Sequence, residues 1–155
     1  MLLGSNTFSY RSALINSKKS FEEGENEDAY KSIRGVKVAE DDAEDADKVR
    51  ICMQLQKQIN SYNNYYSMGM YLESLDSLVK GIRSYDENRD KADKYEIIGQ
   101  FNALEGKIAG ALYNEFGVTE TRAREMNEIE DRQEYTDELD KIIADWREKI
   151  KEDEK

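Results

Sequence analysis

Residues 52–82 read CMQLQKQINSYNNYYSMGMYLESLDSLVKGI, and the spacing of their apolar side chains decides the fold class. Two series of apolar residues step alternately by three and four positions, with one shift of phase near Gly69. This repeat is typical of a helix that packs along another helix in a coiled coil. The sequence predicts a rod from Asp42 to Tyr85, about 60 Å long, with Gly69 as the place where it bends or breaks.

The segment before this rod carries weaker helical signals. Apolar residues about seven apart predict a helix from roughly Thr7 to Phe21, and the polar run 22–26 ends it. A second short helical segment follows from Ala29, after which residues 36–38 suit either a helix end or extended chain.

The segment after the rod predicts a return helix. The polar run Asp86–Asp90 is expected to be the turn, and a helix from about Lys91 to Phe116 is expected to end at Gly117. Gly106 and Gly110 lie four apart in this helix, which favours a close approach of another helix. Seven residues are expected to pack mutually across the hairpin: Ile59, Leu72, Leu75, Ile82, Phe101, Leu104 and Ile108.

A last helix is predicted to begin at a cap on Thr119 or Thr121 and to run to about Lys151. It carries a narrow apolar stripe on a densely charged surface. We expect this stripe to meet a second chain, with Trp146 as the anchor; packing of Trp146 inside the same bundle is about equally compatible with the pattern. The residues expected to bind a partner are Tyr135, Leu139, Ile142, Trp146 and Ile150.

These segments together predict an all-α fold with more than about 65% helix, well above the usual third. We expect an elongated antiparallel helical hairpin or bundle with a long charged C-terminal helix. Its parts are an N-terminal helical segment (1–38), a long helical hairpin (39–117) and an amphipathic C-terminal helix (118–155), all within a single domain.

The composition excludes several kinds of chemistry. The 155 residues include 23 Lys and Arg against 34 Asp and Glu, which gives a net charge of −11, and they include no His, no Pro and one Cys. Catalytic triads, His-ligated metals, Cys-rich zinc sites and a disulfide framework are thereby excluded. The negative charge argues against a general nucleic-acid binder. We expect no enzyme activity, no cofactor and no bound metal.

Three local patterns have a functional reading and a simpler structural one. Asp86, Asn88 and Asp90 match the start of an EF-hand loop, but Lys91 stands where the turn glycine belongs, so a solvated turn is favoured over a calcium site. The acidic runs Glu22–Asp28 and Glu40–Asp47 suit charged helix ends or contact with a basic partner. The tyrosines are predicted to serve core and interface packing; they are Tyr62, Tyr65, Tyr66 and Tyr71.

Two short stretches resemble known families. Residues 69–75, with Lys80-Gly81-Ile82, resemble the centre of a tetratricopeptide repeat over about 20 residues, although no second copy follows at the family's repeat spacing. The order of Ser20-Phe21, residues 35–38 and Asp41-Asp42-Ala43 loosely resembles the N-terminal coiled-coil region of bacterial flagellins and hook-filament junction proteins. Neither resemblance is used to assign a function.

The sequence therefore favours a non-enzymatic helical interaction or assembly component. Structural, adaptor and chaperone-like roles in a bacterium or phage belong to this class, with self-association or a protein partner and no membrane. The alternative is an acidic inhibitor that mimics nucleic acid and occupies a basic groove on a host or defence protein. The single cysteine suits a reducing cytoplasm, and assembly into a virion or other particle is the other location considered.

Overall fold

The computed structural model describes the backbone of residues 2–36 and 42–155, and the side chains of these ranges from residue 10 onward. Of the described residues 85% are helical and none lies in a strand. The expected all-α class is thereby confirmed. Seven helices occur in these ranges: α1 (Leu2–Glu22), α2 (Asn26–Ile33), α3 (Ala43–Ser67), α4 (Tyr71–Lys94), α5 (Ile98–Phe116), α6 (Glu120–Asn127) and α7 (Arg132–Asp153).

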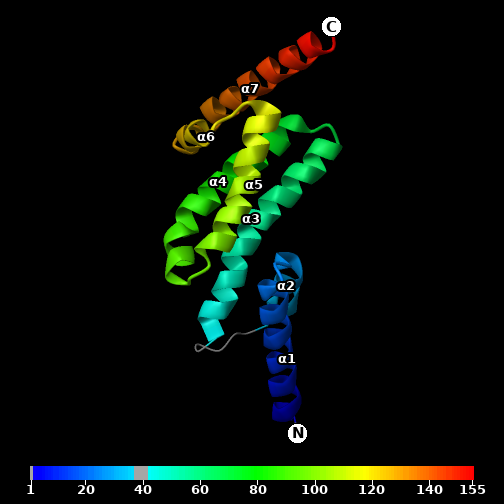
Figure 1. Cartoon of the computed structure of the whole chain (residues 1–155), viewed down its shortest axis with the longest axis vertical. Coiled ribbons are helices and arrows are strands. Elements are labelled where there is room, and N and C mark those ends of the chain that lie inside the picture. The colour runs from blue at the N-terminus through cyan, green and yellow to red at the C-terminus, as the bar shows by residue number, and fades with distance from the viewer. Residues whose placement is uncertain (1, 37–41) are drawn as a thin grey trace.

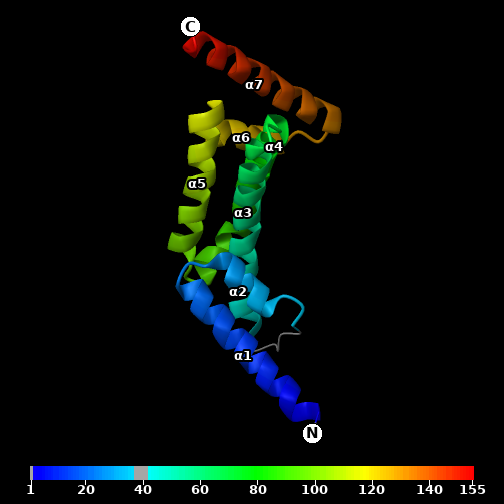
Figure 2. The ribbon, with the colours of Figure 1, turned by 90° about the vertical axis from the view of Figure 1, so that its right-hand side faces the viewer.

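The centre of the molecule is a bundle of three helices. α3 and α4 form an antiparallel hairpin, and α5 returns along α4 while also touching α3. The hairpin of α1 and α2 lies against the first half of α3 at one end of the elongated molecule, and α6 and α7 cover the other end (Figures 1 and 2). The two chain termini therefore lie at opposite ends of the long axis.

The bundle buries one continuous apolar core. All seven residues expected to pack together belong to this cluster: five are buried, while Ile59 and Leu72 are half-buried against it. The predicted core is thus confirmed. The described residues with the largest fully buried side chains include Phe101, Leu55, Leu78, Leu112 and Met126.

The predicted rod from Asp42 to Tyr85 breaks at Gly69, the place named for a bend or break, and the chain reverses there. Gly69 adopts a left-handed conformation with φ of 73°, and the Met70 amide donates back to the Tyr65 carbonyl at 2.9 Å. This pattern ends helices at glycine, which alone adopts that conformation without a Cβ clash. The two apolar series therefore belong to two antiparallel helices that face each other.

The predicted turn at Asp86–Asp90 is also wrong, because these residues lie inside α4. Tyr85 and Ala92, seven residues apart, are both buried, so the inner face of the helix continues past the polar run. α4 ends instead at Tyr95–Ile97, where Glu96 has a φ of 60° and the Ile97 amide donates to the Ala92 carbonyl at 2.9 Å.

The C-terminal region forms two helices rather than the single one predicted. Gly117 ends α5 in a left-handed conformation as expected, and the Thr119 hydroxyl accepts a hydrogen bond from the Arg122 amide at the start of α6. α6 ends after two turns, and Asp131 caps the new helix α7 through the Glu134 amide at 2.8 Å. A carboxylate at this position satisfies amides that would otherwise lack partners.

The expected close approach at Gly106 and Gly110 is wrong. A Cβ atom added at either glycine would meet nothing within 4 Å. The close approach occurs at Gly81 in α4, where an added Cβ would lie 2.7 Å from Cδ1 of Ile108. Glycine is therefore required on the helix that faces α5, and not in α5 itself.

The N-terminal hairpin has a small core of its own. The predicted helix at 7–21 lies within α1, and α2 follows the predicted break. Ala29 and Ile33 of α2 pack with Ala46 and Val49 of α3, and the Ser17 hydroxyl donates to the Ala29 carbonyl at 2.8 Å. The uncertain stretch at Lys37 and Val38, and the acids Glu40 and Asp41, lie outside the described residues.

Candidate protein-binding surface

A row of aromatic rings in mutual contact lies across the end of the bundle that α7 covers. Consecutive ring centres are 4.6 to 5.7 Å apart, which is the range of attractive aromatic pairs. The rings come from the end of α3, the start of α4, the end of α5 and the middle of α7. They are, in spatial order, Tyr62, Tyr66, Tyr71, Trp146 and Phe116.

The segment that supplies the tyrosines contains no charged side chain. Between Lys57 and Glu73 stand fifteen consecutive residues, 58–72, without Asp, Glu, Lys or Arg, in a chain that is 37% charged. This segment forms the last part of α3, the reverse turn and the first residues of α4. We call the surface formed by residues 58–72, Trp146 and Ile150 the uncharged end.

Apolar side chains are exposed at the uncharged end. Met68 and Met70 flank the reverse turn and are 62% and 39% exposed, and Ile150, one turn beyond Trp146 in α7, is 38% exposed. Asn63, Asn64 and Ser67 supply exposed amide and hydroxyl groups beside them. Scattered exposed apolar residues are normal on monomers. Here they coincide with tyrosines and a lack of charge, a composition typical of protein interfaces.

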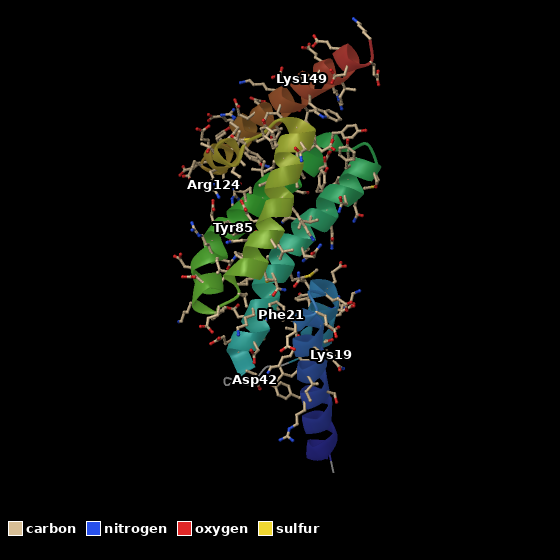
Figure 3. All side chains as sticks on the ribbon, viewed as in Figure 1. Lys19, Phe21, Asp42, Tyr85, Arg124 and Lys149 are labelled. Carbon is tan, nitrogen blue, oxygen red and sulfur yellow. The ribbon has the colours of Figure 1, made fainter. Side chains whose placement is uncertain are left out.

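Two tyrosines of this segment, Tyr62 and Tyr66, have a raised pKa. Burial, reinforced by a hydrogen bond from the Tyr66 hydroxyl to Glu115 at 2.9 Å, raises the pKa of Tyr66 to about 12. Burial and the same carboxylate also raise the pKa of Tyr62. Tyr62 and Tyr66 therefore add no charge to residues 58–72 in the physiological range, and the carboxylate beside Tyr66 is that of Glu115. Charge returns at the border of the uncharged end, for example at Lys149 on α7 (Figure 3).

The five residues predicted to bind a partner lie largely against the chain's own core. Leu139 is 2% exposed, Tyr135 donates to Asp76 at 2.6 Å, and Ile142 is half-buried against the main cluster. Trp146 is half-buried against Tyr71 and Phe116, and Ile150 remains exposed. The structure thus leaves the outer edge of Trp146 and Ile150 as the accessible part of the stripe. Burial and the bond to Asp76 raise the pKa of Tyr135.

Sequence reasoning missed the reverse turn as part of this surface. The signal was present as the long gap in charge at 58–72. The tyrosines were assigned to core and interface packing in a rod that bends or breaks at Gly69, and the exposure of Met68 and Met70 follows only from the reversal of the chain there.

A second cluster of polar groups lies where α4, α5 and α6 meet. Arg124 of α6, which is labelled in Figure 3, lies in this cluster. It donates to Asp86 of α4 through Nε at 2.9 Å and to Glu120 through Nη1 at 3.2 Å. Burial, reinforced by a hydrogen bond and repulsion from Glu120, raises the pKa of Glu105 to about 7. α6 packs mainly on α4, and one oxygen of the Glu105 carboxyl is buried without a hydrogen-bond partner. The only cysteine, Cys52, is buried, and its pKa is raised to about 12.

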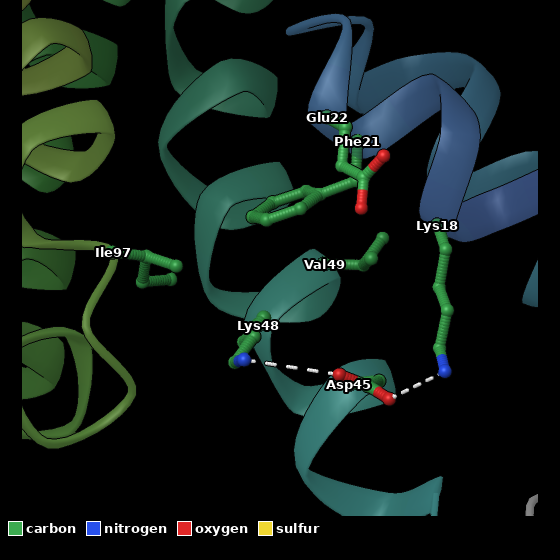
Figure 4. Close-up of a pocket in the computed structure, with 7 residues that line it drawn as sticks. All are labelled: Lys18, Phe21, Glu22, Asp45, Lys48, Val49 and Ile97. Atoms are coloured by element: carbon green, nitrogen blue, oxygen red, sulfur yellow. Dashed lines mark ion pairs between the residues drawn. The ribbon is translucent and has the colours of Figure 1, made fainter.

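A hollow lies between α1, α3 and the turn that precedes α5 (Figure 4). Its floor contains Phe21 and Val49, and its rim contains Lys18 and Lys48 on either side of Asp45. Asp45 pairs with Lys18 at 3.0 Å and with Lys48 at 3.7 Å, and Lys48 also pairs with Glu44 at 3.5 Å. Both lysines of the hollow are therefore already paired with carboxylates, and the Lys18–Asp45 pair joins α1 to α3.

The acidic run at the start of α3 is also engaged within the chain. Glu44 and Asp45 pair with Lys48, and Asp47 accepts from the Tyr95 hydroxyl at 2.6 Å and pairs with Lys91. The described residues contain no group of three or more potential metal ligands placed to hold an ion. Within the same described ranges, no helix combines the length and apolar character needed to cross a bilayer.

Comparisons of this chain with models of known protein families, with curated proteins and with solved structures gave no match. The resemblances to tetratricopeptide repeats and to flagellin-type coiled coils therefore gain no support from them.

Proposed function

We propose that this chain is a non-enzymatic helical component of a protein assembly, and that its uncharged end binds another protein chain. The observation that carries the proposal is the coincidence, at one place, of exposed apolar groups, half-buried aromatic rings and fifteen residues without charge. Aromatic residues and methionine are enriched at protein interfaces, whereas Lys, Glu and Asp are depleted there. The class includes structural, adaptor and chaperone-like roles in the cytoplasm or in an assembled particle.

The half-buried rings suit the uncharged end to binding with little rearrangement. Trp146 is held between Tyr71 at 4.6 Å and Phe116 at 5.5 Å, and Tyr66 is held by Glu115. Side chains that are already fixed lose little conformational entropy when a partner covers them. The flexible methionines at the turn can then adapt to the partner's surface.

The proposal is tested by the size of the complex that contains the chain in extracts of its source cells. The chain should elute from a sizing column well ahead of a single copy. Met68→Glu places a charge in the uncharged end and should shift the chain to the position of a single copy. Ile15→Glu is the matched control, because Ile15 is 64% exposed on α1, and it should leave the complex intact. Elution of the unaltered chain as a single copy would refute the proposal.

The alternative, an acidic mimic of nucleic acid, rests on the net charge of −11. Three described acids at the start of α3 are already bonded to Lys48, Tyr95 or Lys91, which leaves them less free for a basic groove. A mimic would bind its basic target more weakly as salt rises. Binding through the uncharged end should show no such loss.

A further inference from the structure

The charge distribution narrows the choice of partner for the uncharged end. The whole chain carries a net charge of −11. A basic partner gains most from contact with acidic faces, because complementary charges steer and orient binding. Residues 58–72 offer such a partner no charge to pair with, and a carboxylate beside them, that of Glu115, already accepts from the Tyr66 hydroxyl. The uncharged end is instead the place where another strongly acidic protein can approach with the least repulsion.

A copy of the same chain is the acidic protein whose chemistry fits this surface. In a two-fold interface the same patch is used by both copies, so residues near the axis meet their own counterparts. A charged residue there would face a like charge. Asn63 and Asn64 are exposed and carry both donors and acceptors, so each amide can bond to its own copy. The Ser67 hydroxyl donates to the Asn64 carbonyl at 2.8 Å and can still accept a hydrogen bond from the other copy.

The apolar groups of the uncharged end are equally able to meet themselves. Met68 and Met70 are exposed at the reverse turn, directly before Tyr71, whose ring packs on Trp146. Methionine sulfur packs favourably against aromatic rings. In a two-fold arrangement, the methionines of one copy can cover the rings of the other.

We infer that the uncharged end, formed by residues 58–72, Trp146 and Ile150, is a two-fold interface that joins two copies of this chain. This inference rests on the proposed function and names its partner. It also fixes an unusual salt dependence: the apolar contact itself hardly responds to salt, whereas the repulsion between two chains of charge −11 is screened by it. Dimerisation should therefore strengthen as salt rises, opposite to the behaviour of an acidic chain on a basic partner.

The test is sedimentation of the purified full-length chain from about 10 µM to about 1 mM, the range in which weak dimers form, at low and high sodium chloride. The unaltered chain should form dimers, and more of them at high salt. Met68→Glu and, with almost no change in shape, Asn64→Asp should each weaken dimerisation by about tenfold or more, the effect of ~1.4 kcal/mol. Ile15→Glu should leave the dissociation constant unchanged. Circular dichroism should show that all variants keep their helix content.

Three results would overturn the inference. The first is that the chain stays monomeric at about 1 mM and high salt. The second is that a dimer forms but dissociates as salt rises, and the third is that Ile15→Glu abolishes the dimer while Met68→Glu keeps it. If the purified chain is single but its complex in cell extracts is still lost in Met68→Glu, the second-copy inference fails and the proposed function stands. If Met68→Glu changes neither, both fail.

Discussion

Replacing Gly81 and Gly106 by alanine, one at a time, should change the free energy of unfolding in opposite directions. Both glycines lie inside helices, where alanine is favoured over glycine by about 1 kcal/mol. At Gly106 an added Cβ meets nothing within 4 Å. Gly106→Ala should therefore stabilise the chain by about 0.5 to 1 kcal/mol.

At Gly81 the added methyl group meets a side chain that has little room to move. It would lie 2.7 Å from Cδ1 and 3.3 Å from Cγ2 of Ile108, which is fully buried. Rotation of the terminal bond can move Cδ1, but it must then find space in a filled core, and Cγ2 and Cγ1 stay at 3.3 and 3.4 Å. Overpacking of a core costs about 1 to 3 kcal/mol, so Gly81→Ala should lose about 1 kcal/mol after the helical gain is counted.

The measurement is urea unfolding followed by circular dichroism at 222 nm. With an m-value of about 2 kcal/mol per molar, the two midpoints should move about 0.5 M or less in opposite directions. Adding Ile108→Val to Gly81→Ala removes the nearest atom, so the double variant should be more stable than the sum of the two single effects. A Gly81→Ala protein as stable as Gly106→Ala would refute the reasoning, because α4 and α5 could not then be in contact at this position.

Three further changes test other parts of the fold. Glu96 at the end of α4 has a left-handed backbone conformation, which glycine adopts without a Cβ clash. Glu96→Gly should therefore raise the free energy of unfolding by about 1 kcal/mol. A lower free energy of unfolding would mean that a contact of the Glu96 side chain contributes more stability than the backbone strain costs. Glu105 holds its proton up to about pH 7 when folded but releases it near 4.5 when unfolded, so the stability of the unaltered chain should fall as pH rises through this window. Glu105→Gln should remove that fall, so the stability of the variant relative to the unaltered chain should improve between pH 5 and pH 8. If the free energies of unfolding of the two proteins change with pH in parallel, the shifted pKa of Glu105 is contradicted. Trp146→Ala should lower the free energy of unfolding by about 2 kcal/mol, less than for a fully buried tryptophan, with α7 still helical by circular dichroism; a loss below about 0.5 kcal/mol would mean that α7 is not seated on Tyr71 and Phe116.

The helical class and most of the core were determined by the sequence alone. Apolar residues that recur every three to four positions predict helices wherever those helices end. The core residues follow as well, because Leu75, Ile82, Phe101 and Ile108 face inward on helices of any arrangement that buries the stripe. Local chemistry also identified Gly117 as a helix end and Thr119 or Thr121 as the next cap, and the structure selects Thr119.

The positions of the turns were decided by tertiary structure. A helix with a periodic apolar stripe can continue through a glycine, or the chain can reverse there and form two helices. The local sequence is the same in both cases, and the difference is whether the two apolar stripes face each other and become buried. At Gly69 the reversal brings α4 onto α3, whereas the polar run at Asp86–Asp90 stays helical because Tyr85 and Ala92 are buried on either side of it.

The uncharged end also depended on tertiary structure. The tyrosines of residues 62–71 lie far from Trp146 in the sequence, and no local spacing joins them. They meet because α7 crosses the end of the bundle and places Trp146 between Tyr71 and Phe116. The sequence determined which side chains could form an interface. Only the packing of α7 decided which of them are covered by the chain itself and which remain exposed, since burial is a property of the assembled helices rather than of any one of them.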